Sequence, residues 1–527
     1  MKAIYLFILH ITLFTPAFVM AQAGNPDPDF SSNGLVTTSF YSAKHTAANS
    51  VLIQKDDKIL VSGYSGVPGN LDRAVLVRYH PDGTLDNTFN GNGKIMISYP
   101  GNHSYMISSI QLPDERILSL VSLDNNSNDS IALYCFHPNG SLDPAFNTDG
   151  MATLNLGTAY QEPTSLALQY DGKIVIGGYV GRQDEDFDKF FVVRFMPNGT
   201  PDITFGDDGV TITEVGEGYT NIGSILIQPD GKIIAAGNGI FNDLEKFAVA
   251  RYEVNGALDN SFGEEGIAIA SFSNSNARAT GAVLQPDGKI VLGGYATAIG
   301  GNHDFAVARF TTEGSLDNSF HGDGLTTIEV TTFADYARAI LLQPDGKIVL
   351  GGLTHSNMEG GSNMSLVRLT VNGIPDYTFD NDGIVEFAAV SVNSDEIYSI
   401  AMQDDGKIVA AGYARNGDYN EIAVARFLSG LTVSTHEVAI PIKAISLYPN
   451  PANAQITIEY ELSLNTTVAF HLLDLQGRIV QTLLTSVPEG PGKHIETLEI
   501  SRPLPAGSYL ISLSTEEGMK AVRVIID

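Results

Sequence analysis

Arginine and aspartate recur at fixed positions along this 527-residue chain, and their pairing is the first chemistry that the sequence offers. The arginines are Arg78, Arg194, Arg251, Arg309, Arg368 and Arg426. The aspartates are Asp27, Asp86, Asp143, Asp202, Asp259, Asp317 and Asp376. A buried Arg–Asp pair fixes the geometry of a turn, and one pair for each copy of a repeat favours architecture over catalysis. Asp143 lacks an arginine in this scheme, because Cys135 replaces it.

Acidic, glycine-rich turns are the second candidate and could supply oxygen ligands for calcium. They lie at positions 206–209, 263–266, 322–324 and 380–383. None completes an EF-hand loop, which ends in a glutamate at its twelfth position. Turn chemistry alone accounts for Gly and Asp at such places. We expect solvated turns, with low-affinity Ca²⁺ sites as the alternative.

The histidines are scattered and do not have metal-ligand spacing. His80 and His137 share a turn position before proline, where we expect solvated side chains. We expect His103 and His303 in loops at one end of the fold. Neither a Gly-x-Ser-x-Gly elbow nor a Gly-x-x-x-x-Gly-Lys-Ser/Thr loop is convincing. The sequence therefore predicts no enzyme, with no catalytic and no cofactor-binding residues, and leaves metal ligands undetermined.

These residues belong to a repeat that is 57 to 60 residues long. Gln228-Pro229-Asp230-Gly231-Lys232-Ile233 recurs at 285–290 and 343–348, with looser copies at 54–59, 113–117, 169–174 and 403–408. Apolar β-type runs flank each Asp-Gly turn, which predicts a hairpin. A run such as Phe247 to Tyr252 predicts a third strand, and Ile267 to Phe272 a fourth.

Seven repeats of four strands predict an all-β, seven-bladed β-propeller over residues 22–430. Two smaller all-β domains are the alternative. Residues 26–34 match the Leu-Asp-x-x-Phe segment of the repeat, but nothing matches it after Phe427. We therefore expect the next strand, Leu35 to Phe40, to pair with the last repeat and close the ring.

Glycine pairs end the second strand of several repeats, at 177–178, 293–294 and 351–352. Close backbone approach near a crowded axis would favour them. Tyr64, Tyr179, Tyr295 and Tyr413 lie just beyond this position. We expect these tyrosines to pack between blades, with a ligand-binding ring around the channel as the alternative.

The Gln-Pro-Asp-Gly-Lys-Ile, Ala-Arg-Phe and Leu-Asp-x-x-Phe elements resemble the bacterial delta-60 repeat, a propeller-type repeat. The resemblance covers roughly Gly24 to Phe427 and implies architecture and export, with no enzymatic activity common to the family. The second repeat departs most, with Glu115-Arg116 for Gly-Lys and Cys135 for arginine.

After a linker at 431–444, residues 445–527 predict a small Ig-like β-sandwich. Its Tyr448-Pro449-Asn450-Pro451 start, the 474–478 turn, the 504–509 segment and the Lys520 to Asp527 ending are similar to the type A C-terminal sorting domain of type IX secretion. That resemblance implies passage across the outer membrane of a Bacteroidetes-type bacterium, followed by release or attachment to surface lipopolysaccharide. An ordinary accessory domain is the alternative.

Residues 1–21 have the pattern of a signal peptide, and no later segment is long and apolar enough to span a membrane. We therefore expect an extracellular or cell-surface protein. Its formal net charge of −30 disfavours nucleic-acid partners. The single cysteine, Cys135, cannot form an intramolecular disulfide, and a buried strand position is expected for it.

Three functions remain open for such a chain. The first is a non-enzymatic module that binds an unknown extracellular protein or glycan through loops at one end. The second is an extracellular enzyme acting on polysaccharide, which would need paired acids that break the repeat symmetry. The third is a structural surface or matrix protein.

Overall fold

The computed structural model describes residues 22–526 except for short gaps. The gaps are 32, 43, 69–70, 100–101, 125–128, 158–159, 182–187, 299, 356–360, 390–393, 432–441, 451, 453–454, 464, 474–478, 501–503, 505–506 and 516–517. The expected signal peptide at 1–21, most of the expected linker and the expected 474–478 turn lie outside the described residues. The described chain divides into two compact units at Leu431.

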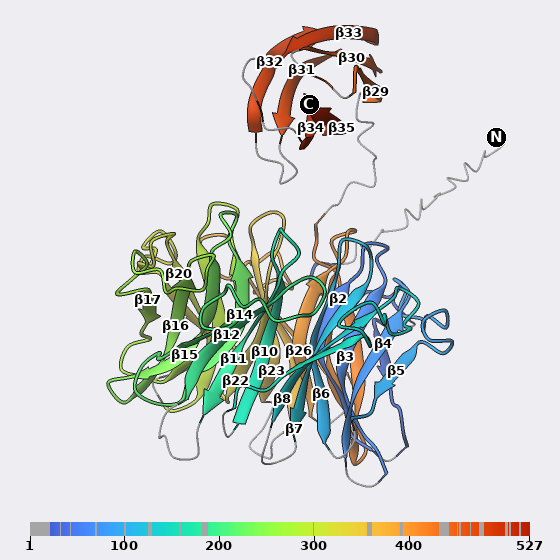
Figure 1. Cartoon of the computed structure of the whole chain (residues 1–527). Helices are drawn as coiled ribbons and strands as arrows, with labels where there is room; N and C mark the ends of the chain where they lie inside the picture. The colour runs from blue at the N-terminus through green and yellow to red at the C-terminus, as the bar shows by residue number, and fades with distance from the viewer. Residues whose placement is uncertain are drawn as a thin grey trace, which may run out of the picture. The chain divides into compact units, whose positions relative to one another are not determined.

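The first unit contains seven four-stranded antiparallel sheets, as the repeat predicts (Figure 1). Blade 1 contains β2 (Thr46–Ile53), β3 (Ile59–Gly66), β4 (Asp72–Tyr79) and β5 (Lys94–Ile97). Blade 2 contains β6 (His103–Gln111), β7 (Ile117–Asp124), β8 (Ser130–Phe136) and β9 (Met151–Leu154). Blade 3 contains β10 (Tyr160–Leu168), β11 (Ile174–Gly181), β12 (Lys189–Phe195) and β13 (Val210–Thr213).

The remaining blades repeat this order. Blade 4 contains β14 (Asn221–Ile227), β15 (Ile233–Phe241), β16 (Leu244–Tyr252) and β17 (Ile267–Ala270). Blade 5 contains β18 (Ala277–Leu284), β19 (Ile290–Thr297), β20 (His303–Phe310) and β21 (Leu325–Ile328). Blade 6 contains β22 (Asp335–Leu342), β23 (Ile348–His355), β24 (Ser362–Leu369) and β25 (Ile384–Phe387).

Blade 7 is assembled from both ends of the propeller sequence. It contains β26 (Asp395–Met402), β27 (Ile408–Asn416), β28 (Tyr419–Phe427) and the N-terminal β1 (Leu35–Thr38). β1 pairs with β28 from Leu35↔Ala425 to Thr38↔Ile422, and β26 lies against β2 (Figure 1). The expected closure of the ring by strands from both termini is therefore confirmed.

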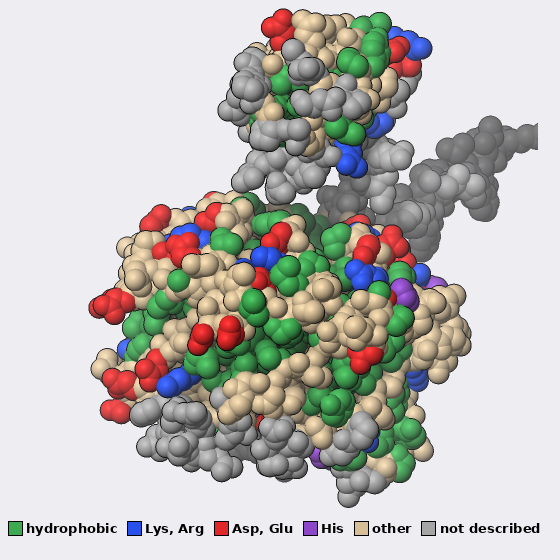
Figure 2. All heavy atoms as spheres, in the orientation of Figure 1, with side chains coloured by type: hydrophobic (Ala, Val, Ile, Leu, Met, Phe, Trp, Pro, Cys, Tyr) green, Lys and Arg blue, Asp and Glu red, His purple; other side chains and the backbone are tan. Residues whose placement is uncertain are grey.

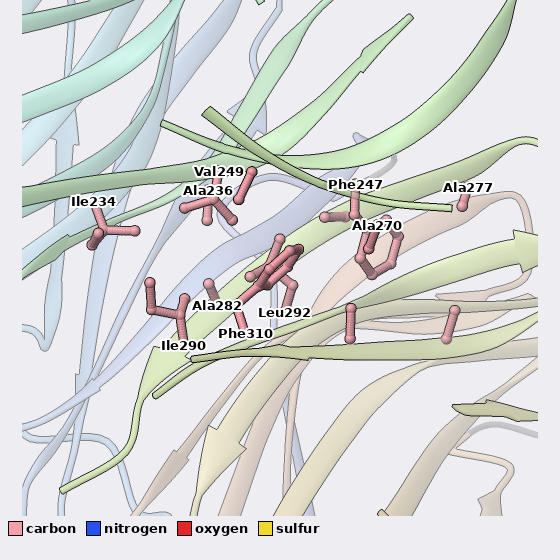
Figure 3. Packing of buried hydrophobic residues seen from close by; sticks show 14 of the residues in the cluster. Ile234, Ala236, Phe247, Val249, Ala270, Ala277, Ala282, Ile290, Leu292 and Phe310 are labelled. Atoms are coloured by element: carbon pink, nitrogen blue, oxygen red, sulfur yellow. The ribbon is translucent and has the colours of Figure 1, made fainter. Parts of the chain in front are cut away.

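The core lies between blades, in apolar layers that each pair of neighbours shares. Figure 3 shows one such layer, in which Ile234 and Phe247 of blade 4 pack with Ile290, Leu292 and Phe310 of blade 5. A fully buried side chain of this kind contributes about 1.5–3 kcal/mol. Each blade shares such a layer with the neighbour on either side, all the way around the ring.

Glycine pairs near the axis have the role that the sequence predicts. A Cβ on Gly294 would lie 2.0 Å from the carbonyl oxygen of Arg278 on the innermost strand. One on Gly293 would lie 2.7 Å from Leu350 of the next blade. The backbone oxygen leaves no room for a side chain at Gly294, whereas a side chain at Gly293 would force Leu350 of the next blade to move.

The second unit is a β-sandwich of two sheets, as predicted. One sheet contains β29 (Ile442–Tyr448), β30 (Gln455–Leu462) and β33 (Gly492–Glu499). The other contains β31 (Thr466–Leu473), β32 (Ile479–Glu489), β34 (Gly507–Thr515) and β35 (Gly518–Ile526). Asn450 ties the Tyr-Pro-Asn-Pro start to the last strand, since its Oδ1 accepts a hydrogen bond from Ile525 N at 2.8 Å. Within the described residues, no helix is long and apolar enough to cross a membrane.

Candidate functional site

The recurring arginines and aspartates form a structural clamp at one end of the propeller. This end holds the Asp-Gly turns and is called the turn end. Arg251 Nε lies 2.6 Å from Asp259 Oδ2, and both side chains are buried. The same guanidinium lies over the Phe262 ring at 4.5 Å and donates a hydrogen bond to Thr312 O of the next blade at 2.6 Å. The clamp therefore joins each blade to its neighbour, as an architectural role requires.

Six copies of this clamp have the same parts. The pairs are Arg78–Asp86, Arg194–Asp202, Arg251–Asp259, Arg309–Asp317, Arg368–Asp376 and Arg426–Asp27. A lysine from the Asp-Gly turn also reaches each aspartate, as Lys232 reaches Asp259 at 2.7 Å. Only the last pair spans the ring closure, because Asp27 precedes β1 and Arg426 lies in β28.

Blade 2 corrects the expectation that Asp143 has no arginine partner. Arg116, which occupies the turn-lysine position, places Nη1 2.7 Å from Asp143 Oδ2. Cys135 is fully buried in the slot that arginine fills elsewhere, as expected for a structural cysteine. The expectation rested on strand positions alone. In blade 2 the positive charge comes instead from the turn, where Arg116 is longer than the lysine of the other blades and reaches Asp143.

The clamp predicts acid sensitivity. Burial alone would raise the pKa of Asp86, but hydrogen bonds from Thr88 and the charge of Arg78 outweigh it and lower the pKa to about 2. Similar donors lower the pKa of Asp317 to about 2. A depressed folded-state pKa stabilises the fold above the usual value of 3.8, and that stability is lost as the pH falls towards 2.

We therefore expect the free energy of unfolding to fall steeply between about pH 4.5 and pH 2, by about 2 kcal/mol for each such aspartate. Urea denaturation at a series of pH values measures this. Asp86→Asn protein should show a smaller decrease than wild type over the same range. A stability that stays flat down to pH 2 would contradict the clamp.

The acidic turns and the turn histidines contain no assembled metal site. Asp323 Oδ1 and Asp382 Oδ1 accept hydrogen bonds from Leu325 N and Ile384 N, as in ordinary Asx turns. Among the described residues, no three His, Cys, Asp or Glu side chains are grouped to hold a metal ion. His80 and His137 are exposed beside clamp aspartates. Calcium binding at these turns stays a prediction.

The opposite end of the channel differs from blade to blade. The side chains paired with the second strands there are Ala47, Tyr105, Glu162, Asn221, Arg278, Tyr336 and Glu396. Two residues further along, a β-bulge interrupts each innermost strand, at Asn49, Ile107, Thr164, Gly223, Thr280, Arg338 and Tyr398. Bulges re-aim side chains. We call these two rings of residues the channel mouth.

An open cavity of about 230 Å³ lies on the axis and is lined from all seven innermost strands. Asn49, Thr164, Thr280, Arg338 and Tyr398 of the bulge ring line it. Serine hydroxyls just beyond the bulges accept backbone hydrogen bonds across blades, as Ser224 Oγ does from Ala282 N at 3.0 Å. The bulges therefore expose polar side chains to the cavity while the backbone donors beside them stay paired.

The four tyrosines of the second strands lie at the channel mouth, and their packing is mixed. Tyr64 packs edge-on against Tyr105 of blade 2, and Tyr295 against Tyr336 of blade 6, with ring centroids 5.3 and 4.9 Å apart. These contacts between blades confirm the expected role. Tyr179 and Tyr413 instead contact Tyr160 and Tyr398 of their own blades. All four are half-buried, so part of each ring remains accessible.

Two histidines expected in loops begin strands instead. His103 is the first residue of β6, and its Nδ1 lies 3.1 Å from Asp72 Oδ2, which also accepts a hydrogen bond from Tyr105 at 2.8 Å. His303 begins β20 and contacts both Tyr295 and Tyr336. The two strands therefore begin earlier than their apolar runs indicate, because aromatic side chains pack at the channel mouth in place of aliphatic ones.

Two glutamates at equivalent positions of blades 3 and 7 break the repeat symmetry. Burial raises the pKa of Glu162 to about 7, although Ser122 donates a hydrogen bond to its carboxylate at 3.2 Å. Glu396 Oε1 accepts a hydrogen bond from Tyr413 at 2.8 Å. Its Oε2 is buried, and Tyr398 also interacts with this carboxylate. Burial therefore brings the pKa of one carboxyl close to neutrality, whereas the other carboxylate is surrounded by tyrosine hydroxyls of its own blade.

Sequence reasoning missed most of the channel mouth. Arg338 and Tyr398 lie five positions before Gln343 and Gln403, which begin the Asp-Gly turn motifs of their repeats. Alignment of the seven repeats on that motif would have shown a variable position between uniform ones. The residues that recur from repeat to repeat are instead the structural ones.

Comparison with known families agrees with both units. A β-propeller domain of unknown function, DUF5122, matches seven segments at 54–89, 113–146, 169–205, 228–262, 285–320, 343–379 and 403–433. A secretion-system C-terminal sorting domain matches residues 446–527. The chain is a DUF5122 β-propeller with a type IX sorting domain. The sorting domain sends this propeller to the cell surface or the extracellular space.

Several solved structures are distantly similar to this DUF5122 protein. The polysaccharide lyase Uly1 is 13% identical, with a TM-score of 0.42, over 79% of this chain and 94% of its own. An α-L-arabinofuranosidase of Fusarium graminearum is 10% identical, with a TM-score of 0.40, over 78% of this chain and 98% of its own. Likenesses at these scores carry no inference about activity. No curated protein matches the chain.

Proposed function

We propose that this protein is a secreted, non-enzymatic binding module that holds an extracellular partner, a protein or a glycan, at its channel mouth. One observation carries the proposal. The clamp residues at the turn end repeat almost without change, whereas the equivalent positions at the channel mouth hold tyrosine, glutamate, arginine and asparagine in different blades. Architecture explains the repeated residues, and recognition of an asymmetric ligand explains the varied ones.

The chemistry of the mouth fits binding. Half-buried tyrosines offer aromatic faces with polar tips, a combination enriched at recognition surfaces. On the face of the propeller that Figure 2 shows, acidic side chains are spread out rather than gathered in one patch. We also propose that residues 1–21 are removed on export from a Bacteroidetes-type bacterium. The exported propeller is then released or attached to surface lipopolysaccharide.

An enzyme acting on polysaccharide is the second candidate, and Glu162 is the observation that favours it. A carboxyl with its pKa raised to about 7 by burial can act as a general acid at neutral pH. Glu396 would be the second carboxylate. This candidate therefore predicts product formation that depends on Glu162.

The test is a glycan-array and cell-extract binding assay on the secreted protein, with and without Ca²⁺, beside a screen for polysaccharide cleavage. We expect saturable binding, no cleavage, and the same result for Glu162→Gln in the cleavage screen. Cleavage that falls about 10²–10⁴-fold in Glu162→Gln would establish the enzyme instead. Neither binding nor cleavage would leave the structural surface protein as the function.

A further inference from the structure

Arg338 stands out among the residues of the channel mouth because its charge is unpaired. It projects from the bulge of β22 into the lining of the axial cavity and is half-buried. Among the described residues, its guanidinium makes no hydrogen bond and no ion pair, and its Nε is buried without a partner. By contrast, the clamp arginines of the turn end each reach a carboxylate, as Arg78 reaches Asp86 at 2.8 Å.

A guanidinium has five N–H donors and cannot be deprotonated in a protein. Removing it from water without a partner is costly, and a carboxylate or sulfate offers the planar or forked acceptor that it pairs with best. We propose that Arg338 anchors the acidic group of a glycan, so that the ligand of the channel mouth is an acidic sugar. This inference rests on the proposed binding function and names its ligand class.

The neighbours of Arg338 favour a sugar over a bare anion. Its Cζ lies 5.7 Å from the Tyr336 ring centroid and 5.8 Å from that of Tyr398, so two aromatic rings flank the charge. Tyr398 also lies near Glu396: burial raises the pKa of the Tyr398 hydroxyl most, and the charge of the Glu396 carboxylate raises it further.

Glu396 lies two positions before Tyr398 on the same strand, and its carboxylate repels anions. A uronate or sulfated sugar suits this setting, because its acid pairs with Arg338 while its hydroxyl groups bring no further negative charge near Glu396. A free anion or a polyanion such as nucleic acid would meet Glu396 and the net charge of −30 without that compensation. The mouth is therefore matched to a molecule that carries both an acid and hydroxyl groups.

The size of the cavity sets how much of the glycan enters. Its volume of about 230 Å³ corresponds to about eight water molecules, at ~30 Å³ each. That volume suits one sugar residue, so we expect the terminal or branch residue of a glycan to enter while the rest stays outside. Sequence-equivalent bulge residues such as Thr164 and Thr280 would contact the same residue from other blades.

Calorimetric titration of the secreted protein tests this. The probes are trigalacturonate, the same trimer with its carboxylates reduced to alcohols, and dextran sulfate. If the acid of the natural ligand is a carboxylate, we expect trigalacturonate to bind; if it is a sulfate, we expect dextran sulfate to bind. The reduced trimer, which carries no acid, should not bind in either case. Arg338→Gln should weaken binding about 10- to 100-fold, and Arg338→Lys should restore part of it.

Arg278→Gln is the matched control, because this arginine of the same mouth lies 3.9 Å from Glu245 Oε1 and is already compensated. It should change affinity less than Arg338→Gln does, and both variants should melt at the wild-type temperature. Binding confined to neutral glycans, or unaffected by Arg338→Gln, would overturn the acidic-sugar proposal while the binding function stands. Absence of any ligand, on the array as well as in these titrations, would count against the binding function itself.

Discussion

Deletion of residues 22–38 should open the propeller ring and remove most of its thermal stability. These residues supply β1 to blade 7 and Asp27 to the clamp of Arg426. Breaking a buried ion pair by removing one partner costs about 3–5 kcal/mol. Loss of the strand adds the apolar surface that Phe30 and Leu35 bury against their neighbours. The total approaches the 5–15 kcal/mol that stabilises a whole domain.

Scanning calorimetry of the deleted and the intact protein measures this effect. Asp27→Asn alone should lower the melting temperature clearly, since it leaves Arg426 buried without its carboxylate. Asp29→Asn is the matched control, because Asp29 is exposed and contributes only its backbone N–H to Asp27. If the deleted protein melts like the intact one, the ring does not depend on closure by the N-terminal strand.

Arg116→Ala should destabilise the propeller by about 3 kcal/mol, and Cys135→Arg should rescue it. The first change leaves Asp143 buried without a cation, which is the costly way to break a buried pair. The second places an arginine opposite Leu118, which is where Arg78 stands opposite Leu60 in blade 1. Blade 2 would then carry the clamp of the other blades.

Urea denaturation of the two single variants and the double variant gives the coupling energy between the sites. We expect the double variant to be more stable than Arg116→Ala by more than about 1 kcal/mol, with Arg116→Lys combined with Cys135→Arg close to wild type. An Arg116→Ala protein within about 0.5 kcal/mol of wild type would show that the pair seen in blade 2 contributes little.

The architecture could be predicted from the sequence because repetition exposes it. Each Asp-Gly turn, each Arg and Asp and each Leu-Asp-x-x-Phe segment appears several times, so a single chain behaves as its own alignment. Ring closure followed from one unmatched segment at 26–34. Asp143 was misjudged because its partner Arg116 comes from a different element, and only the three-dimensional arrangement brings the two together.

The candidate site could not be predicted in the same way, for a physical reason. Residues of the channel mouth meet because seven innermost strands converge on one axis, so each lies more than fifty positions from its nearest equivalent. Glu162, Arg338 and Glu396 carry no local motif. Their importance depends on a β-bulge that turns side chains towards the cavity, and hydrophobic periodicity does not reveal a bulge.

Two exposed or half-exposed tyrosines of blade 6 test the central claim, that the ligand binds at the channel mouth. Tyr336 lies in the mouth beside Arg338. Tyr377 is 68% exposed at the turn end, next to the clamp residue Asp376. The measurement is the affinity of Tyr336→Ala and Tyr377→Ala proteins for a glycan or protein that the binding assay retains. We predict a loss of about tenfold or more for Tyr336→Ala and none for Tyr377→Ala, with the ligand recovered uncleaved. Loss of binding in Tyr377→Ala alone, or cleavage of the ligand, would contradict the account.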